Sequence, residues 1–175
     1  SDVCSSDLLE ELGARTDIDG AFRFIAHKLV GADLFLDEAS VTGTENALMV
    51  AVRAAGRTII RNAACEPHVQ DLCLLLNAMG AKIGGIGSNV LVIDGVEELG
   101  GADFAIGPDF MEIGSFIGLT AVTRGELAIE GVRAEDLRPL KVAFARLGIS
   151  WRLDAGSEGQ ATLHVPSGQQ MRISN

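Results

Sequence analysis

The sequence of 175 residues lacks the features by which nucleic-acid-binding proteins are recognised. It has no tyrosine, one tryptophan and seven phenylalanines, and its 14 lysines and arginines are outnumbered by 24 aspartates and glutamates. The net charge is −10, and no run of basic residues is interleaved with aromatic ones. Binding of nucleic acid needs cations that neutralise phosphates and rings on which bases stack. The composition therefore indicates that nucleic acid is not a partner.

Cysteine is also scarce. The three cysteines, Cys4, Cys65 and Cys73, have no C-x-x-C spacing and are odd in number, which argues against a disulfide framework and against a zinc site. Three scattered histidines, His27, His68 and His164, add no metal-binding spacing. We therefore expect reduced thiols, a cytoplasmic location, no metal and no cofactor.

Long apolar runs are absent as well. The longest stretches, such as Leu72–Leu76, fall far short of the roughly 20 residues that a membrane helix needs. The polar and acidic start is unlike a secretory signal. One back-translation of Asp2–Leu8 matches the end of a sequencing adapter, so we predict that residues 1–8 are a non-native leader, with a native N-terminus as the alternative.

The most informative feature that is present is an internal repeat. Gly56 and Gly125 lie 69 positions apart, and Gly80 and Gly148 lie 68 apart, each pair within similar surroundings. Each copy is expected to fold as a β-α-β-α-β-β unit, and such units bury their apolar faces against one another. Because the helices are apolar over much of their circumference, the sequence predicts an α/β fold with helices inside and sheets outside.

Hydrophobic periodicity and turn residues place the elements of both copies. We expect Leu147 and Phe116 to face inward with their helices. The expected strands are 22–26, 33–36, 58–61, 82–83, 90–93, 105–106, 127–129, 150–153 and 162–165, and the expected helices are 46–54, 66–79, 109–121 and 135–147.

Helix-capping signals recur at equivalent places in the two copies. Thr42 with Glu45 and Asp109 with Glu112 have the spacing of a capping box, in which a side-chain oxygen and an acid satisfy the first N–H groups of a helix. Glu66 precedes Pro67, and proline suits the first helical position. We therefore expect Thr42, Glu66 and Asp109 to be caps.

Five segments make the sequence similar to a known family: 40–48 (SVTGTENAL), 62–72 (NAACEPHVQDL), 76–83 (LNAMGAKI), 85–88 (GIGS) and 106–116 (IGPDFMEIGSF). They resemble the UDP-N-acetylglucosamine 1-carboxyvinyltransferase family of enolpyruvyl transferases, and the similarity runs from about Leu9 to the end. The resemblance implies two domains of three units each. It implies that 9–30 is the tail of one repeat, 31–104 the last repeat of the first domain, and 105–175 the first repeat of the second.

The resemblance also implies a reaction. Enolpyruvate passes from phosphoenolpyruvate to the 3′-hydroxyl of UDP-N-acetylglucosamine by addition and elimination, and phosphate leaves. The family's proton-donor loop precedes the matching segment and its Asp base follows it, so no catalytic residue is expected in this chain. We therefore expect an internal segment, truncated at both ends, that is inactive without the remainder of the chain.

By resemblance, the turn Glu38, Ala39, Ser40, Val41, Thr42 and Gly43 contacts the nucleotide sugar. Helix geometry supports such a contact, because a turn that opens a helix offers free N–H groups and the positive end of the helix dipole to an anion. Some members have lysine where this chain has Glu38. Asp109, Glu112 and Glu66 are candidate supporting acids at the cleft. Capping explains Asp109 and Glu112 at least as well, and it is the favoured interpretation of Glu66. Two rival functions remain: a shikimate-pathway enolpyruvyl transferase, or a non-catalytic nucleotide-sugar-binding module.

Overall fold

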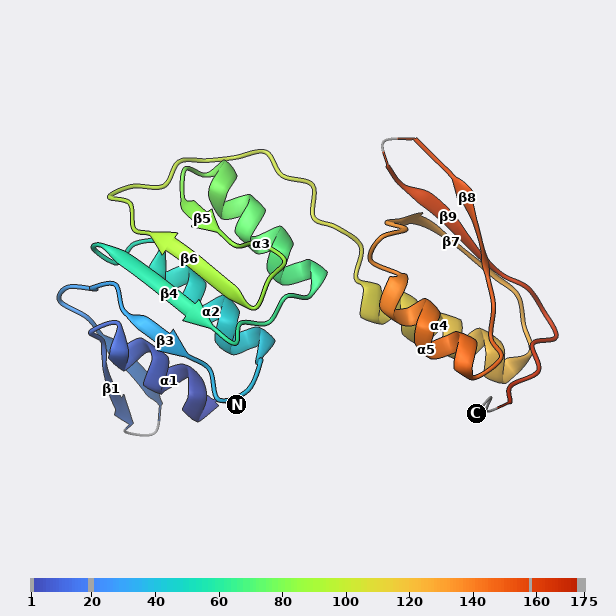
Figure 1. The fold of residues 1–175 in the computed structure, drawn as a ribbon, viewed down its shortest axis with the longest axis horizontal. Coiled ribbons are helices and arrows are strands. Elements are labelled where there is room, and N and C mark those ends of the chain that lie inside the picture. Colours follow the sequence, from blue (N-terminus) through green and yellow to red (C-terminus); the bar gives the residue numbers. More distant parts are fainter. Residues whose placement is uncertain (1, 19–20, 158, 173–175) are drawn as a thin grey trace. The chain divides into compact units, whose positions relative to one another are not determined.

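The computed structural model describes residues 2–18, 21–157 and 159–172. The chain divides into two compact units, Ser1–Ile106 and Gly107–Asn175. Each unit has a sheet and a hydrophobic core of its own (Figure 1).

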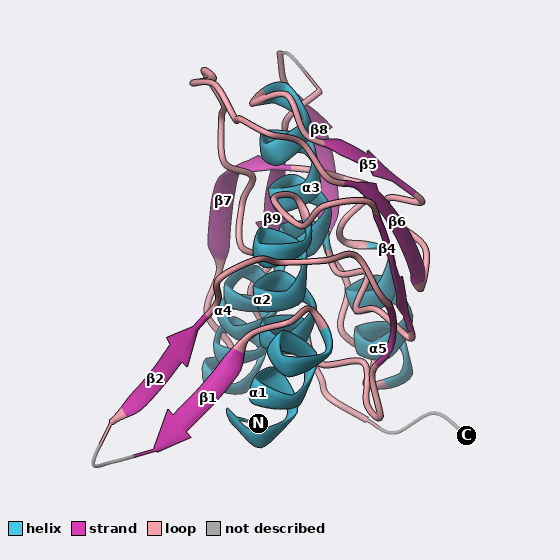
Figure 2. Ribbon diagram, turned by 90° about the vertical axis from the view of Figure 1, so that its left-hand side faces the viewer, coloured by secondary structure: helices cyan, strands magenta, loops and turns pink. Residues whose placement is uncertain are grey.

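The first unit opens with helix α1 (Asp2–Glu11) and an antiparallel pair of strands, β1 (Arg15–Ile18) and β2 (Phe22–Ile25), which projects away from the helices (Figure 2). Helix α1 includes residues that the sequence analysis set aside as a leader, and Leu8 is only 3% exposed in the core beside Leu12. The rest of the unit follows in the order β3 (Asp33–Phe35), α2 (Val41–Ala51), β4 (Arg57–Arg61), α3 (Pro67–Ala78), β5 (Lys82–Gly84) and β6 (Val90–Asp94).

The main sheet of the first unit has the strand order β3-β4-β6-β5. Strands β3 and β4 run parallel, whereas β4–β6 and β6–β5 are antiparallel. Side chains alternate between the two faces of a strand, and on β4 Thr58 and Ile60 are buried while their neighbours are not. Helices α1, α2 and α3 lie along one face of this sheet (Figure 2). Because β3 and β4 are parallel, the loops that follow them lie at the same end of the sheet.

The second unit contains α4 (Phe110–Thr123), β7 (Leu127–Val132), α5 (Arg138–Arg146), β8 (Arg152–Ala155) and β9 (Ala161–Val165). Its sheet is antiparallel throughout, in the order β7-β9-β8. The two helices approach closely at Gly114, where an added Cβ would lie 3.1 Å from Leu140 Cδ2. The buried residues Ile117 and Leu163 belong to the core between helices and sheet.

The expected α/β fold with repeated units is confirmed: within each unit, helices cover one face of the sheet. Several boundaries were wrong. Helix α2 begins at Val41 instead of Asn46 because Ser40 caps it. Helix α5 begins at Arg138 instead of Glu135, after a turn, with Pro139 in its first turn where a missing N–H costs nothing. The strand β1 was missed, since its polar sequence Arg-Thr-Asp-Ile shows no apolar alternation.

The strand expected at Ala105–Ile106 is not formed. Both residues lie outside any strand, and Ile106 is 87% exposed. A short extended segment becomes a strand only when a neighbouring strand supplies hydrogen bonds. In the second unit β7 therefore has β9 as its one partner among the described residues.

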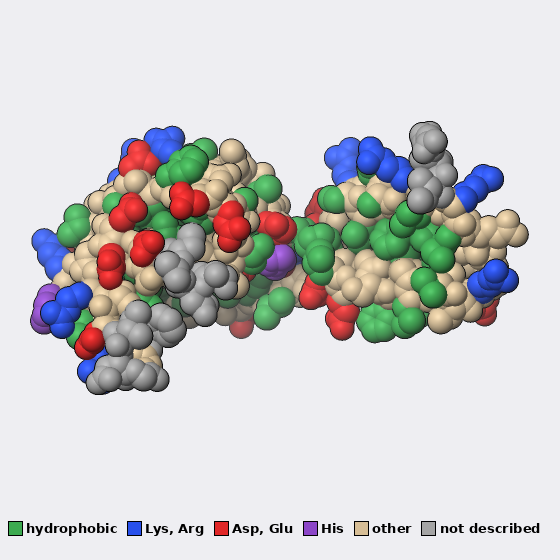
Figure 3. Space-filling model, turned by 90° about the horizontal axis from the view of Figure 1, so that it is seen from below, with side chains coloured by type: hydrophobic (Ala, Val, Ile, Leu, Met, Phe, Trp, Pro, Cys, Tyr) green, Lys and Arg blue, Asp and Glu red, His purple; other side chains and the backbone are tan. Residues whose placement is uncertain are grey.

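Two side chains expected to face inward are instead exposed. Leu147 follows the last residue of α5 as its C-cap, and Phe116 lies on the side of α4 that its own unit leaves uncovered. Apolar side chains gather on the helical side of the second unit (Figure 3). The large apolar residues that are exposed on its helices are Met111, Phe116, Leu119, Val122 and Val142.

Candidate functional site

The best-defined part of the predicted site is the start of helix α2. Ser40 is the N-cap, with an extended backbone, and its Oγ accepts a hydrogen bond from the N–H of Gly43 at 3.1 Å. The prediction that Thr42 caps the helix was wrong, because Thr42 already lies inside the first turn. The pairing of Thr42 with Glu45 as a capping box was wrong for the same reason. Thr42 Oγ1 lies instead 3.4 Å from Ser40 Oγ.

Exposure differs along the predicted turn. Glu38, Ala39 and Thr42 are exposed and Ser40 and Val41 half-buried, whereas Gly43 is buried. A Cβ at Gly43 would lie 3.2 Å from both Cβ and Oγ of Ser40, so a larger residue there would press on the capping side chain. The N–H groups of the first residues of a helix have no partner within the helix, and among the described residues the side chain of Ser40 satisfies that of Gly43. The turn thus offers N–H groups and hydroxyls to an anion.

A second loop lies against this turn. Because β3 and β4 are parallel, the loop that follows β4 lies at the same end of the sheet as the Ser40 turn, which follows β3. Asn62 Nδ2 donates to the carbonyl of Leu36 at 2.9 Å, and the N–H of Ala64 donates to Thr44 Oγ1 at 2.9 Å. Neither Thr44 nor Asn62 was among the residues predicted from the sequence. The signals that point to them are a threonine in a helix of small apolar residues and an asparagine at a strand end.

Glu66 ends this second loop as the N-cap residue of α3, before Pro67. The prediction that its side chain caps the helix was wrong, since its carboxylate makes no capping hydrogen bond. Its Oε2 is buried without a hydrogen-bond partner among the described residues. A buried carboxylate oxygen with no donor is costly, so Glu66 has capacity to accept a hydrogen bond near the candidate site.

Asp109 and Glu112 lie in the second unit, at the start of α4. Asp109 Oδ1 accepts hydrogen bonds from the N–H of Met111 at 2.9 Å and of Glu112 at 3.2 Å. Asp109 is therefore a helix cap, which is the alternative that the sequence left open. Glu112 is exposed in the first turn, where its charge is favourable to the helix dipole.

The two cysteines whose side chains the structure describes lie in different surroundings. Burial raises the pKa of the Cys73 thiol to about 11, so it is protonated at neutral pH and is a poor nucleophile. Cys65 is a free and exposed thiol in the loop after β4. The side chain of Cys4 lies outside the described residues.

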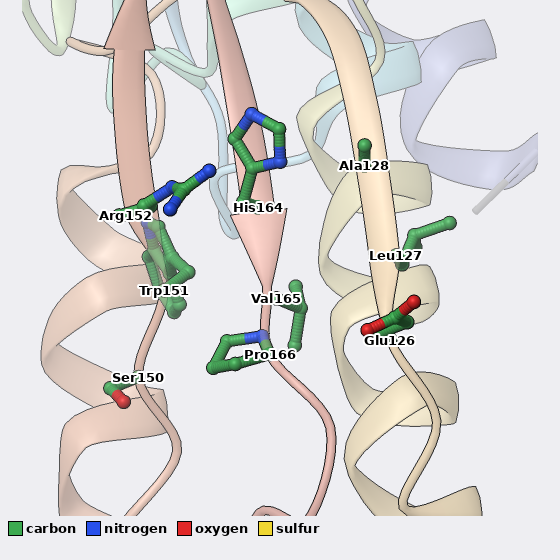
Figure 4. A pocket seen from close by; sticks show the side chains of 9 residues that line it. All are labelled: Glu126, Leu127, Ala128, Ser150, Trp151, Arg152, His164, Val165 and Pro166. Carbon is green, nitrogen blue, oxygen red and sulfur yellow. The ribbon is translucent and has the colours of Figure 1, made fainter.

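A cavity of about 730 Å³ lies on the sheet of the second unit (Figure 4). Arg152 and His164 line it from neighbouring strands, with Glu126 on the opposite side. Asp154 Oδ2 lies 3.1 Å from His164 Nε2 and 3.5 Å from Arg152 Nη2. None of the predicted site residues lines this cavity. Within residues 2–18, 21–157 and 159–172 no cluster of side chains is suited to a metal ion, and no helix is long and apolar enough to cross a membrane.

Sequence comparison relates the chain to enolpyruvyl transferases. A family model described as EPSP synthase (3-phosphoshikimate 1-carboxyvinyltransferase) matches residues 5–166. Curated relatives named UDP-N-acetylglucosamine 1-carboxyvinyltransferase include a protein of Treponema denticola, 61% identical over 165 residues, and one of Treponema pallidum, 57% identical over 165 residues. Each alignment covers 94% of this chain and 38% of the relative. The chain thus spans about 38% of the length of these relatives.

Solved structures share the fold at low sequence identity. The enolpyruvyl transferase NikO from Streptomyces tendae aligns with a TM-score of 0.77 and 22% identity, over 95% of this chain and 42% of that one. An EPSP synthase from Acinetobacter baumannii aligns with a TM-score of 0.65 and 20% identity, over 93% of this chain and 38% of that one. Because the family model matches most of the chain and the curated relatives are closely similar, the chain belongs to the enolpyruvyl transferase family.

Proposed function

We propose that the chain is the nucleotide-sugar-binding part of a UDP-N-acetylglucosamine 1-carboxyvinyltransferase. The observation that carries this proposal is the 61% identity with the Treponema denticola relative of that name over 94% of the chain. The proposed reaction moves enolpyruvate from phosphoenolpyruvate to the 3′-hydroxyl of UDP-N-acetylglucosamine and releases phosphate, which begins peptidoglycan synthesis. We place it in the cytoplasm, for which the free thiols of Cys65 and Cys73 give support.

In this reaction the 3′-hydroxyl of the sugar loses its proton as its oxygen forms a bond to C2 of phosphoenolpyruvate, and C3 takes up a proton. The bond between C2 and the bridging oxygen of the phosphate then breaks as C3 gives a proton back. The proton that the sugar loses is carried away in the net reaction by the released phosphate. We assign no proton transfer to this chain. Its part is binding, through Glu38, Ala39, Ser40, Val41, Thr42 and Gly43.

The start of α2 supports this assignment physically. The positive end of the helix dipole and the N–H groups of its first turn favour an anion such as a diphosphate. Ser40 Oγ accepts a hydrogen bond from Gly43, so the hydroxyl hydrogen of Ser40 remains to be donated to Thr42 or to a ligand. Glu38 is exposed and repels an anion, so we propose that it lies beside the sugar or base of the ligand and not beside its phosphates.

The test is a hybrid enzyme in which the matching segment of this chain replaces that of the Treponema denticola relative. We expect phosphate release from phosphoenolpyruvate with UDP-N-acetylglucosamine as acceptor, at a rate within about tenfold of the parent. Phosphate release only with shikimate 3-phosphate would favour the EPSP synthase activity that the family model describes. A folded hybrid that binds UDP-N-acetylglucosamine without turnover would favour a binding module, and the 175-residue chain alone is expected to show no turnover.

A further inference from the structure

Three hydrogen bonds between described residues join the chain after β3 to the loop after β4. The N–H of Leu36 donates to the carbonyl of Arg61 at 3.1 Å, which continues the parallel pairing of the strands. In the second bond Asn62 Nδ2 donates to the carbonyl of Leu36, and in the third the N–H of Ala64 donates to Thr44 Oγ1. They hold the segment Asp37–Gly43 at both of its ends.

Thr44 fixes the end that becomes helix α2. It is 0% exposed, and its hydroxyl donates to the carbonyl of Ser40 at 2.7 Å while it accepts from the N–H of Ala64 at 2.9 Å. The hydroxyl therefore links the N-cap residue directly to the neighbouring loop. Valine has nearly the same shape but would leave the N–H of Ala64 without its acceptor.

Asn62 holds the first end of the segment Asp37–Gly43, where the chain leaves strand β3. Its φ of +56° lies in the left-handed region, which asparagine tolerates better than most residues. This conformation accompanies a side-chain hydrogen bond of 2.9 Å from Nδ2 to the carbonyl of Leu36, a residue with no exposed surface. The amide thus holds the chain just before the exposed residues Asp37 and Glu38.

We infer that Thr44 and Asn62 are positioning residues, which hold Asp37–Gly43 in the conformation that receives the nucleotide sugar without touching the ligand themselves. This inference rests on the proposed function. The apparent Kd equals the intrinsic Kd divided by the fraction of molecules whose loop is in the binding conformation. A loop that is ordered before binding keeps this fraction close to one, so no affinity is lost to other loop conformations. Releasing either end lowers that fraction, and the loss falls on the nucleotide sugar alone.

The experiment uses Thr44→Val and Asn62→Gly, first in the 175-residue chain and then in the hybrid enzyme. Glycine adopts the left-handed conformation of residue 62, so Asn62→Gly removes the amide and leaves the backbone free to keep its φ. In the chain, we expect the amide hydrogens of Gly43 and Thr44 to exchange faster with solvent. In the hybrid, we expect the KM for UDP-N-acetylglucosamine to rise by about five- to tenfold, with kcat and the KM for phosphoenolpyruvate within about twofold, as for about one lost hydrogen bond.

Two controls separate positioning from a general loss of stability. Thr44→Ser keeps the hydroxyl and should restore the KM for UDP-N-acetylglucosamine to within about twofold of the unsubstituted hybrid. Thr58→Val alters another fully buried threonine of the same unit, whose hydroxyl has no partner among the described residues, and should leave that KM unchanged.

The outcomes decide between distinct conclusions. An unchanged KM in folded Thr44→Val and Asn62→Gly, or a parallel fall of kcat, overturns the positioning role and leaves the proposed function standing. If Thr44→Val does not fold, Asn62→Gly decides alone, because it removes a bond at the rim of the unit and not in its core. If the unsubstituted hybrid does not use UDP-N-acetylglucosamine, the proposed function fails, and the positioning role for that ligand fails with it.

Discussion

The repeat in the first unit and the repeat in the second unit have the same order of elements from their first helix onward, but they differ at one edge of the sheet. In the first unit β3 lies parallel to β4 and carries the chain directly into the Ser40 turn. In the second unit, within the described residues, no strand pairs with the corresponding edge of β7. The chain that enters the Ser40 turn is therefore held by the sheet, whereas the chain that enters the Asp109 cap is held by no strand among the described residues.

The first helices of the two repeats, α2 and α4, also differ in how far they are buried. In the first unit α2 is buried between the sheet, α1 and α3, and few of its side chains are exposed. In the second unit α4 has a buried face with Ile113 and Ile117, and an exposed apolar face with Leu119 and Val122. A helix that is apolar all round is normally buried. The comparison indicates that a helix of this kind needs neighbours on two sides, which the first unit supplies through α1 and α3.

The largest expected effect tests whether the two units are independent. Leu48 on α2 and Ile117 on α4 are both fully buried, in separate cores. Replacing either residue by alanine should destabilise its own unit by about 3 kcal/mol, from lost burial and the cavity left behind. We expect Leu48→Ala to leave the second unit unaffected, and Ile117→Ala to leave the first unaffected.

The chain has its own probe for each unit. Cys73 is buried in the first unit, and Trp151 is the sole tryptophan and lies in the second. With Cys4 and Cys65 replaced by serine, thiol labelling of Cys73 reports opening of the first unit, and tryptophan fluorescence in urea reports unfolding of the second. Simultaneous shifts of both probes for either substitution would show that the units unfold together and would remove the basis for comparing them as separate bodies.

The next effect concerns the inner face of the first sheet. Thr58 on β4 is fully buried and its hydroxyl has no partner among the described residues, whereas the corresponding position in the second repeat is Leu127. Thr58→Val removes an unsatisfied hydroxyl without changing shape, and should stabilise the first unit by about 1 kcal/mol. Cys73 labelling measures this change. Thr44→Val is the matched control with the opposite expected sign, because the Thr44 hydroxyl makes two hydrogen bonds and its loss should destabilise the unit. Equal destabilisation by Thr44→Val and Thr58→Val would contradict the difference between a satisfied and an unsatisfied hydroxyl.

The sequence predicts the regular parts of both units because periodicity is a local property. The strands at 58–61, 82–83, 90–93 and 162–165 and the helix after Pro67 were expected within one or two residues of where they lie. The glycine pairs of the repeat were less alike than they looked. Gly80 and Gly148 both have a positive φ. In the other pair only Gly56 has one, because in the second unit the left-handed conformation falls on Arg124 and not on Gly125.

The candidate site was predictable only in part. The turn at Ser40 could be located by family resemblance, but its cap was assigned to Thr42 because two hydroxyl residues compete for the same role and spacing does not decide between them. The bonds of Asn62 to Leu36 and of Ala64 to Thr44 join residues 26 and 20 positions apart. Such pairs are set by the parallel register of β3 and β4, which no local pattern specifies.

The smallest effect concerns the outer faces of the two sheets. In the first unit Arg61 pairs with Asp33 and Arg57 with Asp94, each through two hydrogen bonds, the shorter being 2.7 Å. In the second unit the contact of Arg152 with Asp154 is 3.5 Å. Exposed pairs contribute little to stability, but the effect on titration is measurable. The hydrogen bond from Arg61 holds the pKa of Asp33 below its ordinary value of 3.8, and that from Arg57 does the same for Asp94.

A lowered folded pKa means that the pair stabilises the fold above the unfolded value of about 3.8, and that this stabilisation is lost as the pH falls through the folded pKa. Carboxyl-carbon NMR titration should therefore show Asp33 and Asp94 ionising below pH 3.8. Arg61→Gln should return the pKa of Asp33 toward its ordinary value and leave Asp94 unchanged, and Arg57→Gln should do the reverse. A titration of Asp33 that does not respond to Arg61→Gln would mean that the paired geometry is not maintained in solution. The outer face of the first sheet would then be no more ordered by charge than that of the second.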